Sequence, residues 1–76
     1  MPNALALEIE DQLRPVIGTV LAAVSVDVET KRIGKDPETV EPSDVSVIAE
    51  NLVDALRLVL GQELAEAAAR KVRALA

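Results

Sequence analysis

Apolar residues recur at three- and four-residue steps between Val45 and Leu60, which is the spacing of an amphipathic helix. The apolar stripe covers roughly 160° of the helix surface, wider than the ~100° expected of a surface helix. Ser43 is a good N-cap and Gly61 a common stop signal, so the pattern predicts a helix over residues 44–60. The core residues expected from this helix are Val45, Ile48, Leu52, Leu56 and Val59.

Two apolar residues of this segment, Val47 and Leu58, fall on its polar side, close to Asn51 and Asp54. An apolar side chain on a polar face indicates a second contact, either with a sister subunit or with a different protein. We therefore treat these four residues as interface candidates. The alternative is ordinary surface apolarity, which folded proteins tolerate at single positions.

A second helical pattern begins after Asn3, which is a suitable N-cap, and predicts a long helix over residues 4–31. Pro15 lies inside this pattern, so we expect one bent helix; the alternative is a restart near Asp11 or Gln12. The core residues expected from this helix are Ile9, Leu13, Val16, Val20 and Val24.

The end of this first helix carries a competing pattern. Residues 24–30 alternate between apolar and polar side chains and are rich in β-branched types, which is typical of a strand. A single strand would have to pair with a copy of itself in another subunit. We therefore expect helix here and keep the strand as the alternative.

A polar linker follows over residues 32–42 and lets the next helix fold back on the first. Beyond Gly61, residues 62–75 predict a third and shorter helix, with Leu64 and Val72 in its core stripe. Gly61 either separates two helices or lies inside one long helix, and we expect a break or a bend. We find no internal repeat. The fold class predicted from these elements is all-α, as a small helical bundle.

The composition favours a hydrophobic core that is shared between subunits. The chain has 76 residues, half of them hydrophobic, but no aromatic residue, cysteine or histidine. A domain of this size hides only ~60% of its unfolded surface and commonly relies on disulfides, metals or oligomerisation. Because disulfides are excluded and the commonest metal ligand is missing, we expect a homodimer.

The charge pattern narrows the range of partners. A net charge of −5 disfavours nucleic acid, whose binding depends on phosphate neutralisation, and the chain has no aromatic ring for base stacking. The longest uncharged apolar run, residues 15–26, is shorter than the ~20 residues that a membrane span needs. We expect a cytoplasmic protein whose partner is itself, with another protein as a further partner.

Candidate chemistry is sparse. Glu50 and Asp54 lie one helical turn apart and could contact a divalent cation, but we favour the simpler interpretation of a solvated helix face with Asp54 near Arg57. Basic residues near the third helix's end suit the negative pole of its dipole. No serine has a base partner and no phosphate-binding motif is present. We therefore expect no enzyme activity, no cofactor and no metal.

The function expected from these features is a non-enzymatic helical interaction or oligomerisation module. The first alternative is an acidic regulator, such as an antitoxin or an inhibitor, that occupies a basic site on a target protein. A weaker alternative is an accessory subunit of an enzyme.

Overall fold

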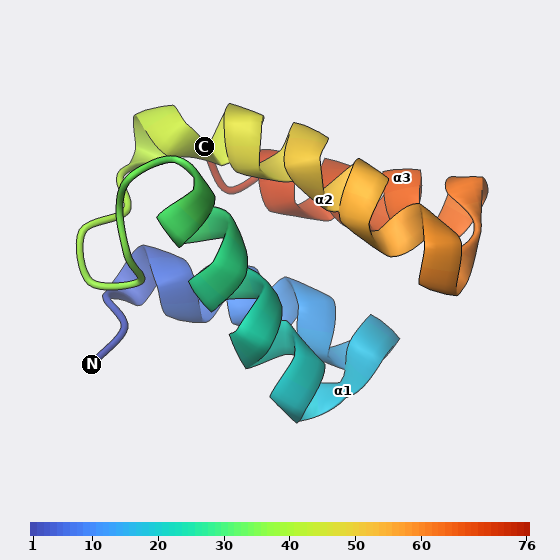
Figure 1. Ribbon diagram of the computed structural model, residues 1–76, viewed down its shortest axis with the longest axis horizontal. Coiled ribbons are helices and arrows are strands. Elements are labelled where there is room, and N and C mark those ends of the chain that lie inside the picture. The colour runs from blue at the N-terminus through green and yellow to red at the C-terminus, as the bar shows by residue number, and fades with distance from the viewer.

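The computed structural model describes all 76 residues and contains helices but no strand. Its elements are α1 (Ala4–Arg32), the short 3-10 turn η1 (Pro42–Asp44), α2 (Val45–Leu60) and α3 (Gln62–Arg73). α2 and α3 lie along one another, and α1 lies across the lower part of the molecule in Figure 1. Residues 24–30 are helical rather than a strand. The predicted all-α class is confirmed.

α1 is broken at Gly18, where the backbone has φ 83° and ψ 168°. The break divides α1 into a first limb, residues 4–17, and a second limb, residues 19–32, which run in different directions (Figure 1). The bend predicted at Pro15 is therefore wrong in position. Pro15 keeps helical geometry because its fixed φ near −65° suits a helix, whereas the angles at Gly18 are open essentially to glycine alone.

Gly61 separates α2 from α3 with nearly the same backbone angles, φ 86° and ψ 162°. The chain therefore turns here, as the glycine predicts. The molecule consists of two helical hairpins with a glycine at each corner. We name the two limbs of α1 the first hairpin, and α2 with α3 the second hairpin. Both corners lie at the same end of the molecule, away from the linker (Figure 1).

The two hairpins carry related sequences, which corrects the expectation of a chain without an internal repeat. A shift of 43 residues aligns Gly18 with Gly61. Between residues 11–22 and residues 54–65, seven of twelve aligned positions are identical. The identical pairs are Asp11 and Asp54, Leu13 and Leu56, Arg14 and Arg57, Val16 and Val59, Gly18 and Gly61, Leu21 and Leu64, and Ala22 and Ala65.

The same shift also aligns buried positions in the two hairpins. Six aligned pairs have both residues buried: Ala6 and Ala49, Ile9 and Leu52, Leu13 and Leu56, Ala22 and Ala65, Val26 and Ala69, and Glu29 and Val72. Sequence identity, glycine geometry and burial thus agree on one register. They indicate a single structural unit that the chain uses twice.

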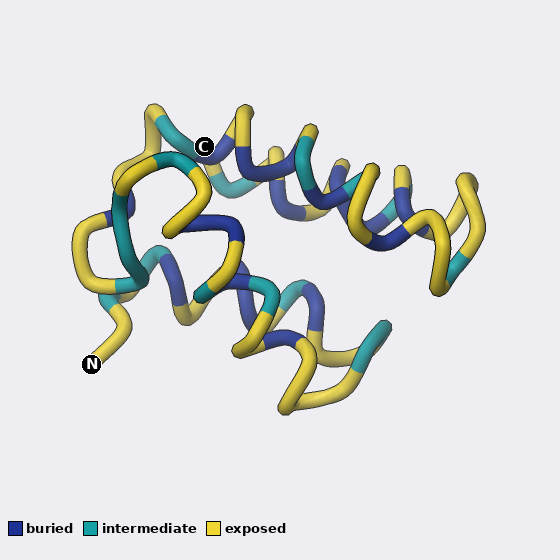
Figure 2. Tube along the Cα trace, viewed as in Figure 1, coloured by how far each residue is buried: buried dark blue, intermediate teal, exposed yellow.

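One cluster of 15 buried apolar residues joins the two hairpins. Buried positions lie on the sides of the helices that face one another (Figure 2). The residues expected in the core and found buried are Ile9, Leu13, Val45, Ile48, Leu52, Leu56 and Val72. The core is therefore built from aliphatic side chains and alanine, as the composition requires.

Four residues expected in the core are exposed instead: Val20, Val24, Val59 and Leu64. Val16 is half-buried. Val20 and Val24 are predicted wrongly because the helical projection treats residues 4–31 as one continuous helix, whereas the chain breaks at Gly18. The break reorients the second limb, which buries a different row that includes Ala22 and Val26. Val59 and Leu64 flank the corner at Gly61, and both side chains are exposed there.

The linker, residues 33–41, is tied to the start of α1. Asn3 caps this helix, since its side-chain oxygen accepts a hydrogen bond from the Ala6 N–H at 2.9 Å. The Asn3 side-chain amide donates to the Val40 carbonyl at 2.9 Å. Val40 itself is buried in the core. One asparagine thus fixes both the helix start and the path of the linker.

An ion pair fixes the other end of the linker at the start of α2. Lys35 Nζ lies 2.7 Å from Asp44 Oδ2, and the same oxygen accepts from the Glu41 N–H at 2.9 Å. The Ser43 cap is wrong, because Ser43 lies inside η1 and Asp44 and Glu41 form the capping contacts. The Lys35 ammonium lowers the pKa of Asp44, and hydrogen bonding to Asp44 raises the pKa of Lys35.

This ion pair predicts a defined pH window. Because the pKa of Asp44 is lowered from 3.8, its contribution to the free energy of unfolding is complete above pH 3.8 and is lost as the pH falls below that. Because the pKa of Lys35 is raised from 10.5, its contribution is complete below pH 10.5 and is lost above it. We expect Lys35→Gln to destabilise the protein between these limits, and the difference from wild type to shrink outside them. Urea unfolding across pH measures this; a difference that persists in acid contradicts it.

Candidate interaction surface

The interface candidates of α2 lie on its outer side. Val47 is 46% exposed and Leu58 is 88% exposed, while Asp54 is exposed and Asn51 half-buried. Steps of three and four residues connect all four, so they form one row along the helix. The row is polar in its centre and apolar at both ends.

A second apolar row lies on the second limb of α1. Val20, Val24 and Val28 follow one another at four-residue steps and are 74%, 47% and 44% exposed. Side chains at this spacing stack on one side of a helix. The next residue in the row is Arg32, which forms an ion pair with the buried Glu29 at 3.1 Å.

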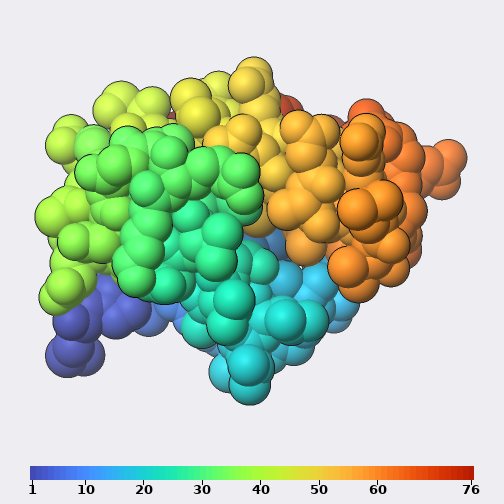
Figure 3. Space-filling view, in the orientation of Figure 1, coloured from blue at the N-terminus to red at the C-terminus, as the bar shows by residue number.

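The two rows meet on one side of the molecule. A hollow of about 200 Å³ between α1 and α2 is lined by Arg32, Asn51, Asp54 and Ala55. Arg32 ends the row on α1, and Asn51 and Asp54 are the centre of the row on α2. In the space-filling view, residues 19–32 and 45–60 occupy the same face (Figure 3). We name this surface, defined by Val20, Val24, Val28, Val47 and Leu58, the α1–α2 face.

The repeat supplies an internal comparison for this surface. The residues at the aligned positions are small, cyclic or charged: Glu63 for Val20, Ala67 for Val24, Lys71 for Val28, Ala4 for Val47 and Pro15 for Leu58. The repeated unit therefore has large aliphatic side chains at these positions in one copy and none at the aligned positions of the other copy. The apolar α1–α2 face is not a requirement of the hairpin fold. The helical pattern alone does not predict that the three valines form a surface. Alignment of residues 19–32 with residues 62–75 does, because it places no large aliphatic residue opposite them.

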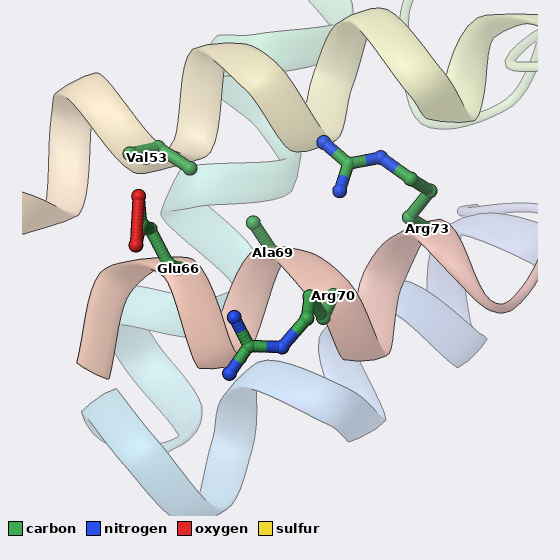
Figure 4. Close-up of a pocket in the computed structure, with 5 residues that line it drawn as sticks. All are labelled: Val53, Glu66, Ala69, Arg70 and Arg73. Carbon is green, nitrogen blue, oxygen red and sulfur yellow. The ribbon is translucent and has the colours of Figure 1, made fainter. Parts of the chain in front are cut away.

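A second hollow, of about 280 Å³, lies between α2 and α3 and is lined by Val53, Glu66, Ala69, Arg70 and Arg73 (Figure 4). Arg73 reaches toward α2, whereas the Arg70 side chain extends along α3 with its guanidinium directed away from that of Arg73 (Figure 4). Because the two guanidinium groups diverge, they do not form one anion site. Glu66 accepts from Gln62 at 3.0 Å.

The acidic side chains do not gather into a ligand set. The structure has no group of three or more histidine, cysteine, aspartate or glutamate side chains placed to hold a metal ion. Asp54 lines the smaller hollow beside Arg32, with Asn51 as a further polar neighbour. No helix has both the length and the apolar character needed to cross a membrane.

The distinctive feature of the surface is therefore the α1–α2 face. Comparison with protein families, with curated proteins and with solved structures finds no match, so the interpretation rests on the chain itself.

Proposed function

We propose that this chain is a non-enzymatic helical interaction module that forms a homodimer through the α1–α2 face. The observation that carries the proposal is the contrast within the repeat. Five large aliphatic side chains, each 44–88% exposed, belong to the two segments that occupy one side of the molecule in Figure 3, and none of their five aligned counterparts is a large aliphatic residue. A soluble surface gains nothing from such side chains unless something covers them.

The size of the face suits a weak dimer. Full burial of a valine or leucine side chain contributes ~1.5–3 kcal/mol, and association costs ~4–15 kcal/mol in lost freedom. Five partly exposed side chains on each copy offset this cost by a modest margin. We therefore expect a dimer that dissociates on dilution.

Light scattering over a dilution series tests the proposal. We expect the wild type to have the mass of a dimer at high concentration and of a monomer after dilution. The Val24→Ser, Leu58→Ser double variant should remain a helical monomer throughout, because both side chains belong to the α1–α2 face. Leu64→Ser is the matched control, since Leu64 is 57% exposed on α3 but lies outside that face.

Two results contradict the proposal. A wild type that is monomeric at every concentration excludes self-association. A double variant that dimerises like the wild type, with an unchanged circular dichroism spectrum, excludes the α1–α2 face as the contact.

A further inference from the structure

We infer that, in the proposed dimer, the second limbs of α1 from two copies pack antiparallel across a two-fold axis beside Val24. This inference rests on the proposed function and adds an arrangement to it. The two-fold axis places Val24 against Val24 of the partner subunit, and Val20 against Val28 of the partner subunit.

The spacing of the three valines supports this alignment of the two limbs. Val20 and Val28 each lie four residues from Val24, so the row has its centre at Val24. Four residues span ~6 Å along a helix axis. Reversal of the row about its centre therefore superposes it on itself, so an antiparallel pair with its axis beside Val24 sets valine against valine at all three positions, with the reciprocal contacts of an isologous interface.

The charges on the second limb favour the antiparallel direction. Every charged residue lies in the last part of the limb, and residues 15–26 carry none. An antiparallel pair places the charged end of each limb beside the uncharged end of the other. A parallel pair would set Asp27 beside Asp27 of the partner subunit and Lys31 beside Lys31 of the partner subunit, and like charges in contact disfavour association.

Small side chains beside the row allow the limbs to approach. Ala23 is exposed next to Val24, and its aligned residue in α3 is Glu66. Helices that meet through valine and alanine approach to the short end of the usual 8–10 Å interaxial range. α3 carries Glu63 and Glu66 at the corresponding places, and their charge and length keep a second helix away.

The arrangement also accounts for both apolar residues of α2. The second limb runs from the glycine corners toward the linker, and α2 runs from the linker toward the corners (Figure 1). An antiparallel two-fold pair therefore brings the corner end of one copy over the linker end of the other. Leu58 lies near the corner end of α2 and Val47 near its linker end. Each Leu58 is thus directed toward the region of Val47 of the partner subunit.

Single-cysteine variants test this geometry, because the chain has no cysteine of its own. A disulfide forms readily only where two Cα atoms approach within about 4.4–6.8 Å. Under mild oxidation we expect Val24→Cys to link to itself at least tenfold faster than Ala67→Cys, its aligned control on α3. We expect an equimolar mixture of Val20→Cys and Val28→Cys to give the mixed dimer faster than either variant links to itself. The mixture of Glu63→Cys and Lys71→Cys is the control for this pair.

The possible results separate the two proposals. Rapid self-linking of Val20→Cys and of Val28→Cys, without preference for the mixed dimer, shows a parallel pair and overturns the inference. A wild type that dimerises by light scattering, while no variant on the second limb links faster than its α3 control, also overturns the inference but leaves the proposed function intact. A monomeric wild type overturns both.

Discussion

Leu52→Asp is expected to unfold the protein. Leu52 is 1% exposed and lies in the cluster that joins the two hairpins. A buried carboxylate without a partner costs more than ~4–5 kcal/mol, among the largest effects of single substitutions. A domain of 76 residues has a total stability of only about 4–11 kcal/mol at ~0.05–0.15 kcal/mol per residue. Circular dichroism should show loss of helix, and thermal scans should show no cooperative transition.

The same substitution at two other positions provides the controls. Ile9 occupies the position of Leu52 in the first hairpin and is fully buried, so Ile9→Asp should unfold the protein as well. Leu58 lies on the same helix as Leu52 but is 88% exposed, so Leu58→Asp should keep the helical spectrum. A Leu52→Asp variant that melts like the wild type would show that the core has been assigned wrongly.

Gly18→Ala and Gly61→Ala are each expected to lower the free energy of unfolding by about 1–3 kcal/mol, the cost of holding a side chain in a glycine-only backbone region. An added Cβ would meet no atom within 4 Å at either corner, so backbone strain alone sets the loss. Since the two glycines have the same geometry, the two losses should be similar. Urea unfolding of both single variants and of the double variant measures them.

Chemical synthesis provides a control for strain. D-alanine favours positive φ, so D-alanine at residue 18 or 61 should leave stability unchanged or raise it by about 0.4–1 kcal/mol through a restricted unfolded state. Equal stabilities of the L- and D-alanine proteins would show that positive φ is not what these corners require.

Helical periodicity within an unbroken segment predicted burial well. Leu52 and Ile48 lie in a helix whose phase is continuous from its start to Gly61, so the side facing the core could be found by projection. Val20 was misplaced for the opposite reason. It follows Gly18, and a projection carries no information about the rotation that a non-helical residue introduces between two limbs.

The candidate surface could be predicted only in part. Val47 and Leu58 contradict the amphipathic pattern of their own helix, which is why they were found. Val24 and Val28 do not contradict any local pattern, because a row of apolar residues on a helix is also what a buried core row would show. Only the comparison with Ala67 and Lys71, at the aligned positions of the second hairpin, shows that this row is an addition to the fold.

Joining two related hairpins in one chain has a consequence for how large an assembly can grow. The linker holds the hairpins at an effective concentration in the millimolar range, so they pair with each other without depending on encounter between molecules. Two separate, identical hairpins would present the same outer surface twice, and a molecule with two adhesive surfaces can bind two neighbours and extend into a filament. Fusion lets the two surfaces differ in sequence. In the proposed dimer, growth would stop at two copies, because the matching surface lacks the large aliphatic side chains of the α1–α2 face.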